Sequence, residues 1–201
     1  MRVLGIDQSL SKAAIIHMVD REVVEHSLLK TGSAGVKTKR KDTHYFDDLH
    51  QQIHFIVNGI IEEVKYFKPD VIVFEALSFG SVGNATRNLA ELYGAIRDRL
   101  MLDYPEIPVH EYAPTSLKSF AKDYLKEEDQ VEKDSSGKVV LLASKKPKKI
   151  KMDKKMMVKA VREYYGQDYL KDYNYSSGLD DLADATFLAL KVTEEYETKK
   201  T

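Results

Sequence analysis

Short apolar runs and longer helical patterns alternate along this chain and divide it into strands and helices. Residues 3–6 are apolar or small and lead into Asp7, as in a strand that is buried on both faces. Two further runs, Lys12–Val19 and Glu22–Thr31, are separated by only two residues. Three consecutive strands with short connections predict an antiparallel meander at the start of the fold.

The most regular pattern covers His44–Lys68, where apolar residues recur every three or four positions. This spacing predicts a long amphipathic helix. The apolar run Val71–Phe74 follows and ends at Glu75, so it repeats the opening pattern of a buried strand and a carboxylate. Because a helical crossover joins the two parts, we expect this strand to lie parallel to the first strand in one sheet.

The second half of the chain adds helices, one short strand and an insertion. Helices are expected from Pro114 onward and over Asn84–Leu102, Met152–Tyr165 and Leu179–Glu195, and a strand over Ile107–Tyr112. Residues 127–149 fit neither period and predict an inserted loop or hairpin within a single domain of residues 1–201. The whole pattern predicts an α/β fold, in which a mixed five-stranded sheet contains the antiparallel meander plus parallel strands and is flanked by helices.

Carboxylates end the two parallel strands and begin the last helix. Neighbouring parallel strands would bring Asp7 and Glu75 to one sheet edge, where open α/β sheets place their sites. On the last helix, Asp184 shares a face with Asp181 or Asp180, because residues three or four apart lie together. Three of these acids also have an ordinary interpretation: Asp7 suits a turn, and Asp180 and Asp181 complement a helix dipole.

Several carboxylates at one point repel one another, and divalent cations remove that conflict. The chain has no cysteine, and oxygen ligands favour Mg²⁺ or Mn²⁺ over zinc. Two such ions about 4 Å apart serve phosphodiester hydrolysis, where one activates water and the other stabilises the leaving oxygen. The residues alone therefore predict a metal-dependent nuclease.

The charge of the chain is strongly segregated, although its net value is only −1. Nine cations and a single acid, Asp153, lie between Ser144 and Arg162. Basic runs are often only solvated faces, but two separate runs in a nearly neutral chain favour a polyanion-binding surface. The residues expected to bind nucleic acid on this ground are Lys37, Lys39, Arg40, Lys41, Lys145, Lys146, Lys148, Lys149, Lys151, Lys154 and Lys155.

No apolar run approaches the roughly 18 residues that a membrane span needs, and the N-terminus reads as a strand instead of a signal peptide. We therefore expect a cytoplasmic protein with no membrane partner.

Three acidic motifs resemble those of the RuvC Holliday-junction resolvases, a family of the ribonuclease H-like superfamily. They are Gly5-Ile6-Asp7, Val73-Phe74-Glu75 and Asp181-Leu182-Ala183-Asp184-Ala185, in this order and at this spacing. Three further segments are similar to that family: Asn88–Ile96 to the helix after its Glu strand, Tyr112–Lys118 to its Tyr-x-Pro-x-x-Val-Lys segment, and Lys151–Lys155 to its Lys-x-Asp-Lys turn. The resemblance covers most of the chain.

This resemblance implies a ribonuclease H-like fold and a homodimeric, structure-selective endonuclease acting on branched DNA. It implies two Mg²⁺ ions per active site, with Mn²⁺ as a substitute, held by Asp7, Glu75, Asp181 and Asp184. It also implies that Lys118 is a cation near the scissile phosphate and that Lys151 and Lys154 contact DNA. Phe79 matches an aromatic residue with which the family probes the branch point, one position later than the pattern, and a core or dimer-interface role is the alternative.

Two departures resemble the phage-encoded branch of the family. The chain has Asp7-Gln8-Ser9 where cellular members have Asp-Pro-Gly, and its segment Glu127–Lys149 is longer. A phage origin, in a bacterial host cell, and a wider substrate range that includes forks, flaps and three-way junctions are therefore expected. In that family pattern Asp180 has no counterpart, and we interpret it as a helix cap or a residue behind the metal ligands.

Three rival functions stay open on the sequence. A phosphotransferase of the actin and sugar-kinase superfamily could begin with Gly5–Ser9, but it would need a second domain and a second phosphate loop. A non-catalytic branched-DNA-binding protein would account for the basic segments but not for the four carboxylates, which repel DNA without metals. An RNA-processing nuclease of the same superfamily is the third.

Overall fold

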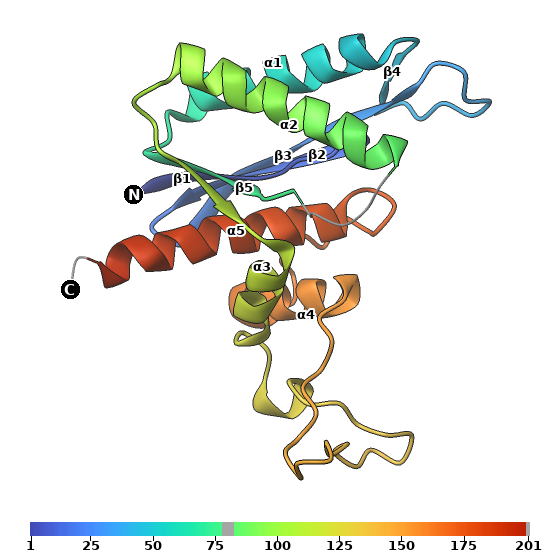
Figure 1. Cartoon of the computed structure of the whole chain (residues 1–201), viewed down its shortest axis with the longest axis vertical. Helices are drawn as coiled ribbons and strands as arrows, with labels where there is room; N and C mark the ends of the chain where they lie inside the picture. Colours follow the sequence, from blue (N-terminus) through green and yellow to red (C-terminus); the bar gives the residue numbers. More distant parts are fainter. Residues whose placement is uncertain (78–82, 200–201) are drawn as a thin grey trace.

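A computed structural model describes residues 1–77 and 83–199 of the chain (Figure 1). Its centre is a six-stranded sheet in the order β4-β3-β2-β1-β5-β6. β1, β2 and β3 form an antiparallel meander, and β4, β5 and β6 each run parallel to the strand they join. The strands are β1 (Arg2–Asp7), β2 (Lys12–Val19), β3 (Glu22–Ser33), β4 (His44–Phe46), β5 (Val71–Glu75) and β6 (Val109–Tyr112).

Helices cover both faces of this sheet. Figure 1 shows α1 and α2 on one face and α5 on the other, with α3 and α4 packed beyond α5. No helix of the described chain combines the length and the apolar character that crossing a lipid bilayer requires. The helices are α1 (Leu49–Phe67), α2 (Asn84–Asp103), α3 (Pro114–Lys122), α4 (Lys154–Tyr165) and α5 (Leu179–Thr198), with a 3₁₀ turn at Glu127–Asp129.

The two faces of the sheet carry two separate hydrophobic cores. On β1, Leu4 and Ile6 pack with α1 and α2, whereas Val3 packs with α5. Because side chains alternate along a strand, Gly5 and Asp7 share the α5 face with Val3. The alternation thus directs the terminal carboxylate of β1 toward the N-terminal turns of α5.

Gly5 lets α5 approach β1 closely. A Cβ atom at this position would press on the backbone oxygen of Ala185 and lie 2.9 Å from Cβ of Ala189. These neighbours are backbone and a short side chain, so neither can move aside without shifting the helix. The small residues on both elements therefore set how near the acids of α5 come to Asp7.

The predicted fold class is confirmed, but the sheet has six strands where five were expected. The additional strand is β4, His44–Phe46, which pairs with the end of β3 and was predicted as the start of a helix. The helix begins only at Leu49, because the carboxylate of Asp48 caps it by accepting hydrogen bonds from the backbone amides of the next residues. Phe46 contacts Phe55 of α1 across 5.4 Å between ring centres, so its apolar position fits the helical spacing although it lies outside the helix.

Residues 130–150, here called the arm, extend from the α3–α4 region away from the sheet (Figure 1). Three isolated antiparallel bridges hold the arm together: Val131 with Lys149, Lys133 with Val139, and Leu141 with Pro147. No residue from 133 to 149 is buried. Backbone hydrogen bonds therefore order the arm, which packs against the core only through Ile150 at its base.

The contact at Gly5 predicts a stability effect. We expect Gly5→Ala to lower the free energy of unfolding by about 1–3 kcal/mol, because the added methyl group overpacks the β1–α5 contact. Urea unfolding followed by circular dichroism measures this. Gly94→Ala in α2 is the matched control, since a Cβ there meets nothing within 4 Å, and it should be neutral or stabilising by under about 1 kcal/mol. Equal stability of the two variants would contradict the close-approach argument.

Candidate active site

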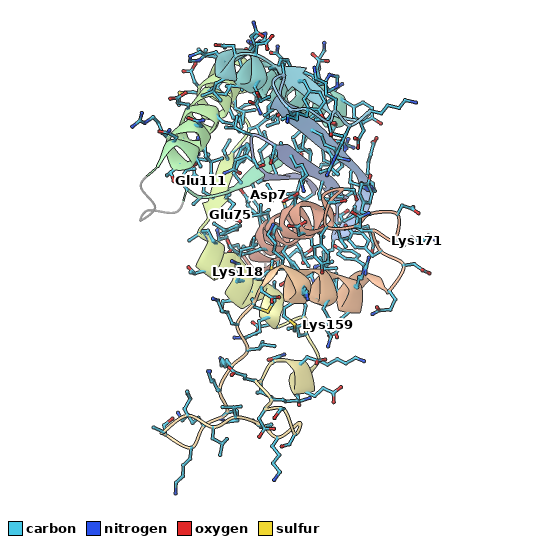
Figure 2. All side chains as sticks on the ribbon, turned by 90° about the vertical axis from the view of Figure 1, so that its right-hand side faces the viewer. Asp7, Glu75, Glu111, Lys118, Lys159 and Lys171 are labelled. Atoms are coloured by element: carbon cyan, nitrogen blue, oxygen red, sulfur yellow. The ribbon has the colours of Figure 1, made fainter. Side chains whose placement is uncertain are left out.

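The four acids that the sequence singles out come from three elements. Asp7 ends β1 and Glu75 ends β5, and the parallel register pairs the residues just before them, Ile6 with Phe74. Asp181 and Asp184 lie in the first turns of α5, which packs on both strands. Figure 2 shows Asp7 and Glu75 at the strand ends, with Lys118 of α3 beneath them.

The electrostatics show that these four acids act on one another. The pKa of Asp7 is raised well above its usual value, first by burial and then by the negative charges of Asp184, Glu75 and Asp181. Burial and the charge of Glu75 raise the pKa of Asp184 to about 7. Burial also raises the pKa values of Glu75 and Asp181. The structure therefore brings the four acids together into one acidic centre.

Three lysines surround this acidic centre. Lys118, exposed on α3, lowers the pKa values of both Glu75 and Asp184 and so offsets part of the burial effect. Lys12 of β2 lies 3.3 Å from Oδ2 of Asp181, measured from its Nζ. Lys154, at the start of α4, donates a hydrogen bond to Asp180. The cations cover the rim of the centre, whereas Asp7 has no counter-charge in direct contact among the described residues.

Two carboxylate oxygens at or beside the centre, Oδ1 of Asp184 and Oδ1 of Asp180, are buried and have no hydrogen-bond partner in the described chain. Oδ2 of Asp181 is also buried and lies 3.3 Å from Nζ of Lys12. Buried acceptors without partners are costly, and hard oxygen donors are what Mg²⁺ and Mn²⁺ bind. The donor chemistry therefore fits a divalent cation. In the side-chain positions observed, however, no three His, Asp or Glu residues of the described ranges form a finished metal-binding group.

The structure changes the interpretation of Asp180. The sequence indicated a helix cap or a residue behind the ligands, but the N-cap of α5 is Gly178, whose φ of 106° is easily adopted only by glycine. Asp180 lies within the first turn, is 3% exposed, and pairs with Lys154. The cap interpretation is wrong, because the backbone turn before α5 already sets where the helix starts. Through its ion pair with Lys154, Asp180 joins α5 to α4 behind the acidic centre, in line with the other of the two interpretations.

The predicted DNA-binding residues lie in three places. Lys37, Lys39, Arg40 and Lys41 are in the loop between β3 and β4, Lys145, Lys146, Lys148 and Lys149 are in the arm, and Lys151, Lys154 and Lys155 are at the start of α4. Two of them are already paired, Lys148 with Glu132 at 2.8 Å and Lys154 with Asp180. Phe79 falls outside the described residues. The roles of all these residues in binding DNA stay predictions.

Sequence reasoning missed two residues of the site. Gln8 is buried, and its Nε2 donates a hydrogen bond of 2.5 Å to the backbone oxygen of Glu75, which ties the end of β1 to the end of β5. Lys12 was not singled out either. Its signal was available, because Asp7 pairs with Ala14 across the β1–β2 ladder and Lys12 lies two positions from Ala14, on the same face.

No protein-family model and no curated protein matches the sequence. Solved structures do match it. RuvC of Thermus thermophilus aligns with TM-scores of 0.60 alone and 0.62 in complex with a Holliday junction substrate, at 17% and 15% identity, covering 100% of this chain and 96% of RuvC. The yeast mitochondrial Holliday junction resolvase aligns at 0.55 and 16% identity, over 94% of this chain and 75% of its own. Fowlpox virus resolvase, solved with Holliday junction DNA, aligns at 0.51 and 14% identity, over 98% and 99%.

The chain has a ribonuclease H-like fold. The match to these Holliday junction resolvases runs over the full chain, at low sequence identity. It confirms the predicted ribonuclease H-like sheet and its flanking helices. The expected phage origin has no support among these matches.

The raised pKa of Asp184 predicts how stability depends on pH in EDTA. The folded protein holds this proton up to a pKa of about 7, whereas the unfolded chain releases it near the ordinary value of about 4. Folding therefore binds a proton between these values, and stability falls as pH rises from about 4 to 7. We expect Asp184→Asn to remove the part of this fall that Asp184 causes, while Asp7 keeps its own part, and to be more stable than wild type at pH 8, by on the order of 3 kcal/mol. Urea unfolding at pH 5 and pH 8 measures it, and equal pH profiles would contradict the assignment.

Proposed function

We propose that this protein is a metal-dependent endonuclease that cleaves branched DNA. The observation that carries the proposal is the acidic centre at one end of the sheet, where the negative charges of Glu75, Asp181 and Asp184 all act on the buried Asp7. The fold is in support, because two of the matching structures, RuvC of Thermus thermophilus and the fowlpox virus resolvase, were solved with Holliday junctions. Holliday junctions, forks and three-way junctions are the proposed substrates.

Asp7, Glu75, Asp181 and Asp184 would hold two Mg²⁺ ions, or Mn²⁺ in their place. When bound, such ions activate water for attack on a phosphodiester and stabilise the leaving oxygen. Their charge would also allow all four carboxylates to ionise at neutral pH, since a bound cation offsets both the burial and the repulsion that raise the pKa values of Asp7 and Asp184. The buried, unpartnered Oδ1 of Asp184 supports this role.

The remaining residues of the centre position the strand ends and the substrate. Gln8 fixes the end of β1 against the backbone of Glu75, so the two strand-end carboxylates keep their spacing. Lys118 faces Glu75 and Asp184 and, being exposed, can reach a phosphate that lies over them. Its positive charge would stabilise the negative charge that builds up on the phosphate during cleavage.

The arm, the start of α4 and the β3–β4 loop supply the positive charge for binding DNA. From residue 135 to residue 152 the chain has six lysines and no acid. Phosphate contacts of this kind give affinity without reading sequence, which suits an enzyme selected by branch shape. A homodimer that acts on two strands of one junction, and an origin in a phage, are further parts of the proposal.

The mechanism predicts the effect of removing each carboxylate. Asp7→Asn, Glu75→Gln and Asp184→Asn should each lower the rate of strand cleavage in Mg²⁺ by at least about a thousandfold, because each removes an ionised oxygen ligand. Binding of a four-way junction in EDTA should be retained or become tighter, since a negative charge is lost. The assay uses labelled four-way, three-way, forked and linear DNA and a structured RNA, with and without Mg²⁺.

The exposed Asp47→Asn is the matched control and should cleave normally. Near-normal cleavage by Asp7→Asn would contradict the mechanism. Tight binding by the wild type with no cleavage of any substrate would favour the non-catalytic alternative. Preferential cleavage of the RNA would favour the RNA-processing one.

The arm predicts a salt-dependent loss of binding. Replacing Lys145, Lys146 and Lys149 together by Gln should weaken four-way junction binding at least tenfold near 150 mM salt. It should reduce the slope of log affinity against log salt by about 2–3, because each phosphate contact contributes about 0.9. Filter binding at several salt concentrations measures both, and Lys65→Gln on α1 is the control. An unchanged slope would remove the arm from the DNA-binding surface.

A further inference from the structure

A pocket with a cationic lining lies next to the acidic centre. It has a volume of about 220 Å³, and four separate segments form its walls: the start of β2, the end of β3, the β3–β4 loop and the connection before α5. Lys12, Lys30 and Arg40 are three of its lining residues, and none of the residues that line it in the described chain is acidic. We call this the cation pocket.

Lys12 joins the cation pocket to the acidic centre. Its Nζ lies 3.3 Å from Oδ2 of Asp181 and donates a hydrogen bond of 3.3 Å to the backbone oxygen of Tyr175. One side chain therefore separates the four carboxylates from a site of opposite charge. A ligand that bridges both sites would carry negative charge on two adjacent groups. One group would lie over the acidic centre and its bound metal ions, and the other would lie in the cation pocket.

The other two cations are held in place by the fold. Lys30 is only 15% exposed along its side chain, and its Nζ bonds Oδ2 of Asp42 at 2.5 Å. Arg40 donates from Nη1 to the backbone oxygen of Ser176 at 3.1 Å, and its backbone amide donates to the hydroxyl of Tyr45 at 2.6 Å. The single guanidinium bond leaves other donors of Arg40 for a ligand, since the group has five. A fixed guanidinium and ammonium suit phosphate oxygens.

The size and chemistry of the pocket select the ligand. A volume of about 220 Å³ is below the roughly 300–1,000 Å³ typical of sites for whole small molecules, but it admits a phosphate and its sugar. Ser11, Thr38 and Thr43, all residues with a hydroxyl group, also line the pocket. These features fit one unit of a nucleic-acid backbone better than a free metabolite.

We propose that the cation pocket binds a backbone phosphate of the substrate strand, beside the phosphate that is cleaved at the acidic centre. This inference rests on the proposed nuclease function and adds to it a fixed register for the strand. It also divides the basic loop, because Arg40 lines the pocket whereas its neighbour Lys41 does not. The pocket therefore acts as a specific site, distinct from the general attraction of an exposed basic loop.

The first test measures four-way junction binding in EDTA, which does not depend on cleavage. We expect Lys30→Gln and Arg40→Gln each to weaken binding about five- to tenfold, and Lys41→Gln to weaken it about twofold at most. Lys65→Gln, on α1, should leave it unchanged. Equal losses for Arg40→Gln and Lys41→Gln, or no loss for Lys30→Gln, would overturn the proposal and leave only diffuse attraction.

A variant of Asp42 separates binding from a structural role of its ion pair with Lys30. If Lys30 binds phosphate, Asp42→Asn frees its ammonium and should tighten binding about threefold, more than Asp47→Asn, a nearby exposed acid, does. If the pair only holds the loop, Asp42→Asn should weaken binding as Lys30→Gln does, and the proposal fails. If the proposal holds, Asp42→Asn therefore tightens junction binding whereas Lys30→Gln weakens it.

A second test locates the phosphate. A series of four-way junctions is made, each with one neutral methylphosphonate at a different position near the cut. At one position, next to the cleaved bond, the substitution should weaken binding by the wild type but should not further weaken binding by Lys30→Gln. Absence of such a position would overturn the inference. Cleavage by the wild type and its loss in Asp7→Asn would still stand in that case, so a failed pocket is distinguishable from a failed nuclease function.

Discussion

The packing of α5 on β1 is the contact on which the acidic centre depends. Gly5 has no side chain, and α5 places Ala185 and Ala189 against it, so the helix lies directly on the strand. This closeness brings Asp184 near enough to Asp7 for its negative charge to raise the pKa of Asp7. A larger residue at Gly5 would move the helix outward and separate the carboxylates, whatever the acids themselves are.

The same contact makes the centre electrostatically unfavourable as it stands. Four carboxylates with raised pKa values, together with the unpartnered buried oxygens of Asp180 and Asp184, oppose stability, and folds keep such arrangements mainly at functional sites. Lys118, Lys12 and Lys154 reduce the cost from the rim without filling the centre. The arrangement is consistent with a centre that divalent cations and a phosphate would complete, and with a cation pocket one side chain away.

The local pattern of the chain was enough to predict most of the elements and the ends of the strands that matter. The crossover between the meander and β5 fixed the parallel pairing, and with it the approach of Asp7 to Glu75, because a helical connection leaves few alternatives. The prediction from the local pattern was wrong at His44–Phe46. Phe46 has the spacing of the apolar residues of α1 and packs on that helix, but it lies in β4. The spacing of apolar residues alone cannot distinguish a residue within the helix from a residue that precedes the helix and packs on it, since both place an apolar side chain on the same surface.

By itself, then, the sequence determined the order and type of the elements, the acids at the strand ends, and the separation of these acids from the basic segments. All of these follow from residues close together along the chain. Only the tertiary structure decided that Asp180 pairs with Lys154, that Lys12 reaches Asp181, and that Lys30 and Arg40 line one pocket. Asp180 and Lys154, like Lys12 and Asp181, lie far apart in sequence, and nothing local distinguishes a lysine that will meet an acid of another element from one that stays in solvent. Their partners are fixed by the packing of β2, β3, α4 and α5 around the sheet.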